Sequence, residues 1–154
     1  MSLEDDVKTL LAADVGTGKF ATLMTGGIYT YESTDQLGLS RDNTTTAAAF
    51  DTTTGRIKPA CVVKMRIRSR DGGPREPGSA SYRQVVELWV YDDRAQDYDV
   101  IDAAQARAFA LLDEKAVGTT KRTLRWIGEF LRTRDPDLDA LVTRHDWDVR
   151  GQLG

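Results

Sequence analysis

Pro59-Ala-Cys-Val-Val-Lys-Met-Arg-Ile-Arg-Ser-Arg70 and Ser81-Tyr-Arg-Gln-Val-Val-Glu-Leu-Trp-Val-Tyr-Asp-Asp93 are two runs in which apolar and polar residues largely alternate. Alternation with a period of two is typical of a β-strand that buries one face. The link between them, residues 71–80, is rich in Gly and Pro, which favour turns and cannot extend a strand. We therefore predict a long antiparallel hairpin whose tip spans residues 71–80.

The outer face of this hairpin is expected to be charged. On the first strand this face carries the basic row Lys64, Arg66, Arg68 and Arg70. The matching face of the second strand carries Glu87. Cross-strand ion pairs contribute only about 0.2–1 kcal/mol each. The buried apolar face is therefore expected to fix the register, because a slip of one residue would turn that face to solvent.

Length and composition indicate one globular domain, residues 1–154. Apolar residues make up 40% of the chain and charged residues 29%, which argues against disorder. The net charge of −3 gives no general attraction to nucleic acid, so direct DNA contact is not expected. There is no apolar run long enough to span a bilayer and no signal peptide, so we expect no membrane contact and a cytoplasmic site of synthesis.

The rest of the chain adds helices and strands around the hairpin. We predict a helix over residues 2–14 with Ser2 as its N-cap, a helical turn over 20–24 and a short strand over 28–32. Residues 33–56 are expected to form a long irregular segment, which is uncommon inside a compact domain. It would be functional, mobile or ordered by a partner.

A second helix is predicted to begin after Asp102, with Gln105 completing a capping box and Ile101 as a hydrophobic staple, and to run to about residue 116. Its apolar side includes Phe109. Residues 122–132 fit a helix nearly as well as a strand, but Gly128 and the β-branched and aromatic residues favour a strand. A second strand with a charged outer face is predicted over 141–150, after a turn at 134–137. The expected fold is α+β: a mostly antiparallel sheet with a long hairpin, packed by two main helices on one face.

Motifs that would carry chemistry are incomplete. Gly16-Thr-Gly-Lys19 lacks the first glycine and the final Ser or Thr of a phosphate loop, so we interpret it as a turn that ends a helix. The acidic stretch 92–99 lacks the spacing of a calcium loop. His145, the sole histidine, is interpreted as a half-buried sheet residue, and Cys61 as a core residue. We expect no catalytic, cofactor or metal site, and no enzyme.

The order of elements resembles the tail-completion or tail-terminator proteins of long-tailed bacteriophages. The resemblance rests on Leu10-Leu11 in the first helix, Gly26-Gly-Ile-Tyr29, Pro59-Ala-Cys-Val-Val63, the strand ending Tyr91-Asp-Asp93 and the alanine-rich helix over residues 103–112. It implies a small α+β protein that assembles into a ring, commonly a hexamer. The ring would cap the tail tube and join it to the head. The 33–56 segment and the extended hairpin depart from this pattern, so a neighbouring head–tail connector stays open.

The resemblance implies contacts with a tail tube protein and a head-completion or connector protein, in the tail or neck of a virion assembled in the host cytoplasm. Within a ring we expect the basic row to meet acidic surface on the adjacent subunit. The candidate interface residues are Lys64, Arg66, Arg68, Arg70, Asp92, Asp93, Asp97 and Asp99. Two alternatives stay open: a monomeric protein-binding module or assembly chaperone, and a small enzyme that uses a carboxylate such as Asp92 or Asp99.

Overall fold

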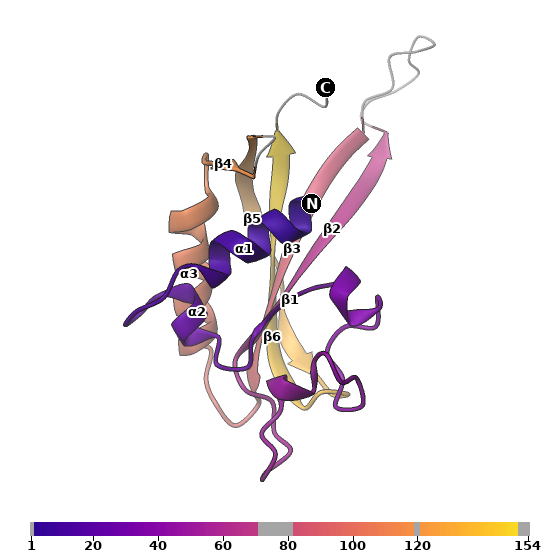
Figure 1. Ribbon diagram of the computed structural model, residues 1–154, viewed down its shortest axis with the longest axis vertical. Coiled ribbons are helices and arrows are strands. Elements are labelled where there is room, and N and C mark those ends of the chain that lie inside the picture. The colour runs from indigo at the N-terminus through magenta and orange to yellow at the C-terminus, as the bar shows by residue number, and fades with distance from the viewer. Residues whose placement is uncertain (1, 71–81, 119–120, 151–154) are drawn as a thin grey trace.

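The computed structural model describes residues 2–70, 82–118 and 121–150 (Figure 1). Its centre is a six-stranded sheet in the order β1-β2-β3-β6-β5-β4. The pair β1–β2 is parallel, and all the other neighbouring pairs are antiparallel. The elements are α1 Leu3–Ala12, α2 Phe20–Leu23, β1 Ile28–Thr30, η1 Glu32–Thr34, η2 Ala47–Ala49, β2 Ala60–Arg70, β3 Tyr82–Asp93, α3 Asp99–Leu112, β4 Ala116–Val117, β5 Arg122–Asp135 and β6 Ala140–Arg150.

The helices lie on one face of this sheet, as Figure 1 shows. Leu11 of α1, Phe20 of α2 and Ala104 of α3 pack in one core with Leu88 of β3 and Trp147 of β6. Burial of this apolar surface supplies the main driving force for docking the helices. The predicted α+β class, with a mostly antiparallel sheet and its two main helices on one face, is confirmed.

The predicted hairpin is present as β2 and β3. Their register places Ala60 opposite Tyr91 at one end and Arg70 opposite Tyr82 at the other. The predicted tip, residues 71–80, lies outside the described residues. The expectation of an exposed Glu87 was wrong, because its side chain is buried.

The two helix starts differ in how far local sequence decides them. Ser2 caps α1 through a capping box with Asp5, as predicted. The predicted start of α3 was wrong, because the helix begins at Asp99, one residue after the N-cap Tyr98. Ile101 and Gln105, expected as staple and cap, lie inside α3 and are buried against the sheet. Tertiary burial outweighs the local capping pattern here.

The 33–56 segment covers the opposite face of the sheet. Its two short 3-10 turns bring Leu39 and Phe50 onto Ala60 and Val62 of β2, where they form a second buried cluster. Figure 1 shows this segment folded beside the end of the sheet that is remote from the hairpin. The segment is therefore ordered by packing within the chain itself.

The last two strands form a longer hairpin than expected. β5 continues to Asp135, through part of the predicted 134–137 turn, and pairs with β6 as far as Ala140. Its pairing is irregular at Trp126/Gly128 and again at Glu129/Leu131. Such bulges increase local twist and re-aim side chains. The short strand β4 was not anticipated from the sequence.

Candidate functional site

The basic row on β2 is only partly available to a partner. Lys64 places its ammonium 4.3 Å from the centre of the Tyr31 ring. Arg66 is held within the chain, with Nη1 3.0 Å from Glu87 Oε2 and Nη2 3.4 Å from Asp146 Oδ2. The side chains of Arg68 and Arg70 lie outside the described part of the molecule. Their proposed contacts with a neighbour stay a prediction.

Arg66 belongs to an ionic cluster on the sheet face opposite the helices. The carboxylates of Glu87 and Asp146 are almost fully buried. Arg144 donates to Asp146 from Nε at 2.9 Å and lies over the Trp89 ring, and the Trp89 indole donates to Glu87 at 3.0 Å. Burying paired charges is tolerated when each finds partners, and removing one partner leaves another charge uncompensated. This cluster explains why Glu87 is buried.

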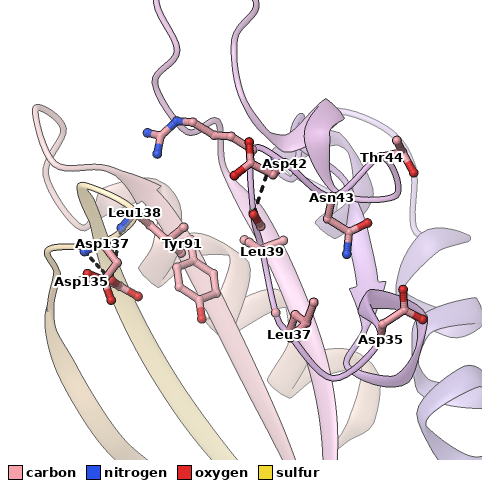
Figure 2. A pocket seen from close by; sticks show the side chains of 13 residues that line it. Asp35, Leu37, Leu39, Asp42, Asn43, Thr44, Tyr91, Asp135, Asp137 and Leu138 are labelled. Atoms are coloured by element: carbon pink, nitrogen blue, oxygen red, sulfur yellow. Dashed lines mark hydrogen bonds between the residues drawn. The ribbon is translucent and has the colours of Figure 1, made fainter.

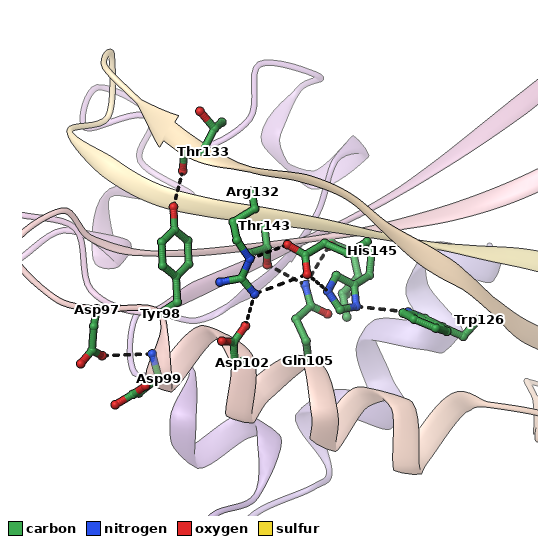
Figure 3. A network of polar contacts seen from close by, with 12 residues as sticks. Asp97, Tyr98, Asp99, Asp102, Gln105, Trp126, Arg132, Thr133, Thr143 and His145 are labelled. Atoms are coloured by element: carbon green, nitrogen blue, oxygen red, sulfur yellow. Dashed lines mark hydrogen bonds and ion pairs between the residues drawn. The ribbon is translucent and has the colours of Figure 1, made fainter.

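The acidic candidates gather at the other end of the sheet. Asp93 lies 3.5 Å from the Arg56 guanidinium, while Asp97 and Asp99 are exposed at the start of α3. Asp97 accepts a hydrogen bond from the backbone of Asp99 at 3.0 Å (Figure 3). The expectation that Asp92 forms part of the acidic surface was wrong, because its side chain is buried beneath that surface. The register of β2 and β3 thus puts Arg70 and the Asp92–Asp93 pair at opposite ends, with Lys64 and Arg66 between them.

A second polar network joins α3 to β5 and β6 (Figure 3). Arg132 pairs with Asp102 of α3 and, at 2.6 Å, with Glu129, and its guanidinium lies 4.4 Å from the centre of the Tyr98 ring. His145 lies beside Glu129, with Nε2 3.7 Å from Oε2. This network braces the helix against the outer hairpin. Its Glu129–His145 contact was missed from the sequence because the bulges in β5 set the register.

His145 and Cys61 occupy the structural roles expected of them. His145 is half-buried, and burial lowers its pKa, although Glu129 opposes this. Its Nδ1 accepts a hydrogen bond from the Trp126 indole at 3.2 Å. Cys61 is fully buried in the core, and burial raises the pKa of its thiol. Gly16 and Gly18 follow α1 with positive φ, as expected of a turn after a helix.

A surface depression lies between the 33–56 segment and the β5–β6 turn. It is a groove of about 910 Å³ with Tyr91 on its floor, as Figure 2 shows. Leu37 stands beside it with 75% of its surface exposed, and Asp42 and Asp135 lie on its rim. Burial raises the pKa of the Tyr91 phenol. Exposed apolar and acidic groups together suit a protein contact.

Exposed aromatic rings form a further surface near the outer edge of the sheet. Phe109 of α3, expected on the apolar side of its helix, is 45% exposed, and Trp126 of β5 is 38% exposed. The two rings meet edge to face with centres 5.8 Å apart. Large aromatic residues are enriched at protein interfaces.

Across 2–70, 82–118 and 121–150, no group of three or more His, Cys, Asp or Glu side chains is placed to hold a metal ion. In the same part of the chain, no helix is both long and apolar enough to cross a bilayer.

Comparison with known proteins relates the chain to others by fold. No protein-family model matches the sequence, and no curated protein is significantly similar to it. A chain from the virion of a native gene transfer agent particle is similar in structure, with a TM-score of 0.55 and 15% sequence identity, over 97% of this chain and 93% of that one. A second solved chain is similar over 100% of this chain and 99% of its own, with a TM-score of 0.50 and 12% identity. The likeness extends over the whole fold rather than one motif.

Proposed function

We propose that this protein is a structural component of a phage-like virion, a tail terminator whose ring caps the tail tube and joins it to the head. One observation carries the proposal: the fold is similar to that of a gene transfer agent virion chain over nearly the full length of both. The order of elements, which resembles tail-terminator proteins, agrees with it. The role is that of a structural protein, without enzymatic activity.

The surfaces of the molecule suit a ring. A ring of identical subunits needs two different, complementary patches on each subunit, so that one patch meets the other on the next copy. The acidic residues at the end of β3 are a candidate for one such patch. The basic residues that the sequence places at the far end of the hairpin are a candidate for the other. The exposed Phe109–Trp126 pair offers apolar contact area at the outer edge of the sheet.

The first test is the mass of the purified protein in solution, measured by light scattering, followed by negative-stain imaging. A hexamer would have six times the chain mass of 17.1 kDa and should appear as a ring. Mixing with isolated tail tubes and, separately, with isolated heads then distinguishes the roles. Binding to tube ends supports a terminator, whereas binding to heads alone favours a neighbouring connector. A monomer at high concentration that binds neither would contradict both and favour the protein-binding module.

A further inference from the structure

His145 of β6 holds the indole of Trp126 through one hydrogen bond. The indole Nε1–H donates to His145 Nδ1 at 3.2 Å, and the two ring centres lie 5.9 Å apart (Figure 3). An imidazole nitrogen accepts a hydrogen bond only when it carries no proton. The contact therefore requires a neutral His145 whose ring proton is on Nε2.

The other ring nitrogen of His145 faces a carboxylate. His145 Nε2 lies 3.7 Å from Glu129 Oε2, which is longer than a hydrogen bond. Nε2 is buried, and no described residue accepts a hydrogen bond from it. Glu129 is held mainly at its other oxygen, where Arg132 Nε donates to Oε1 at 2.6 Å, while Arg132 Nη2 lies 3.4 Å from Oε2. Oε2 can therefore move closer to the imidazole if the imidazole gains a positive charge.

The charged groups that face His145 within the described residues come from β5 and α3. They are Glu129 and Arg132 of β5 and Asp102 of α3. Burial has the largest effect on the pKa of His145 and lowers it from its ordinary value of 6.5. Arg132 lowers this pKa too, whereas the carboxylates of Glu129 and Asp102 raise it. His145 is therefore neutral at pH 7, and the midpoint of its proton uptake lies below pH 6.5.

The Trp126 indole lies where it can exchange His145 for water. Trp126 is 38% exposed, and its ring meets Phe109 edge to face with centres 5.8 Å apart. The Trp126 backbone N–H donates to Asp113 Oδ1 at 2.9 Å, so the backbone stays held when the indole turns. An indole N–H that loses a protein acceptor beside solvent bonds to water instead. Loss of the His145 contact therefore changes the Phe109–Trp126 surface without opening the core.

We propose that His145 is a pH-dependent switch for Trp126: the neutral imidazole holds the indole through Nδ1, and protonation of that nitrogen releases the indole towards solvent. A protonated imidazole is a donor at both nitrogens, so Nδ1–H and the indole N–H would point at one another. The new positive charge also attracts Glu129 Oε2, and salt screens a half-buried pair only weakly. The Phe109–Trp126 surface thus has two arrangements that pH selects. The switch lies within one subunit and does not depend on the proposed ring.

NMR of the 15N-labelled protein tests the switch, because each tryptophan gives its own indole N–H signal. The Trp126 signal, assigned with Trp126→Phe, should move between about pH 7.5 and about pH 5 with the same midpoint as the ring protons of His145. Trp89 is the internal control. Its indole donates to Glu87 on the opposite face of the sheet at 3.0 Å, so its signal should not follow that midpoint.

Three substitutions separate the acceptor from the charge. His145→Asn places an amide oxygen near the position of Nδ1 and cannot gain a proton, so the Trp126 signal should stay fixed across this pH range. His145→Phe removes the acceptor, so the signal should lie near its acid position at every pH. Glu129→Gln removes a carboxylate that stabilises the charged imidazole, so the midpoints of the Trp126 and His145 signals should move together to lower pH.

Two results would overturn the switch. The first is a Trp126 signal that does not move while the His145 ring titrates, or a His145 ring that stays neutral throughout. The second is a Trp126 signal that moves in His145→Asn as it does in the wild type, because another group would then be responsible.

Discussion

The guanidinium of Arg107 on α3 holds the carboxylate of Asp14, in the link between α1 and α2, through two hydrogen bonds. Nε lies 2.8 Å from Oδ2, and Nη2 lies 2.9 Å from Oδ1. The same carboxylate accepts a hydrogen bond from the backbone of Phe20 at the start of α2. The Asp14 side chain, which follows α1, therefore links α3 to the start of α2.

This ion pair should make stability depend on acid pH. The Arg107 guanidinium lowers the pKa of Asp14 from 3.8 to about 2. Because the folded-state pKa lies below the ordinary value, the stabilisation is present above pH 3.8 and is lost as the pH falls towards 2. Asp14→Asn should lower the free energy of unfolding by about 1–2 kcal/mol at pH 7, after allowance for solvent screening. Urea unfolding at pH 7 and pH 2 measures it, and an equal deficit at both would contradict the prediction.

Glu4 should act as a hydrogen-bond acceptor for the edge of β2 rather than as a charge. Its Oε1 accepts a hydrogen bond from the Met65 backbone at 2.7 Å, and burial raises its pKa. A raised pKa means that the charged form costs stability at neutral pH, so Glu4→Gln should maintain or increase the free energy of unfolding. Glu4→Ala should lower it by about 1–2 kcal/mol, because the Met65 N–H loses its partner. Equal unfolding midpoints for the two variants would disprove this account.

Arg66 should contribute to the free energy of unfolding of the single subunit, independently of any role in assembly. Arg66→Glu would bring a third carboxylate against Glu87 and Asp146, and we expect it to lower the free energy of unfolding by about 3 kcal/mol or more. Arg125→Glu is the control, because Arg125 pairs with Glu114 at 3.6 Å with both side chains exposed, where an ion pair contributes less than about 1 kcal/mol. Thermal unfolding of both variants measures the difference. A wild-type melting temperature for Arg66→Glu would show that the cluster adds nothing to stability.

The Phe109–Trp126 pair should contribute more to assembly than to the stability of one subunit. Phe109→Ala removes an edge-to-face contact between half-exposed rings, which should cost about 1 kcal/mol of unfolding free energy. If the proposed ring buries this surface, the dissociation constant of self-association should rise by a larger factor. Val15→Ala, which truncates an exposed apolar residue in the link between α1 and α2, is the control. Comparison of light scattering with urea unfolding separates the two effects, and an unchanged dissociation constant would remove this surface from the ring contact.

The elements predicted correctly are those whose signal is local. The alternation in residues 60–70 and 82–93 marks the central hairpin, because it distinguishes a buried from an exposed face at every second residue. Ser2 and the acidic turn after it mark the start of α1. The same local pattern failed at Asp102, because burial of Ile101 and Gln105 extends α3 one turn earlier. A capping pattern is worth about 1 kcal/mol, less than the burial of large side chains.

Sequence periodicity and caps were thus sufficient for the α+β class, the central hairpin and the core role of Cys61. The tertiary structure alone decided that the 33–56 segment covers the second face of the sheet, and that Arg66 meets Glu87 and Asp146. It also decided that Asp92 lies beneath the surface. These features depend on contacts between residues far apart in the chain. Such contacts form only when burial in the core offsets the conformational entropy that is lost on closing the loops between them. A local pattern of residues carries no information on whether that condition is met.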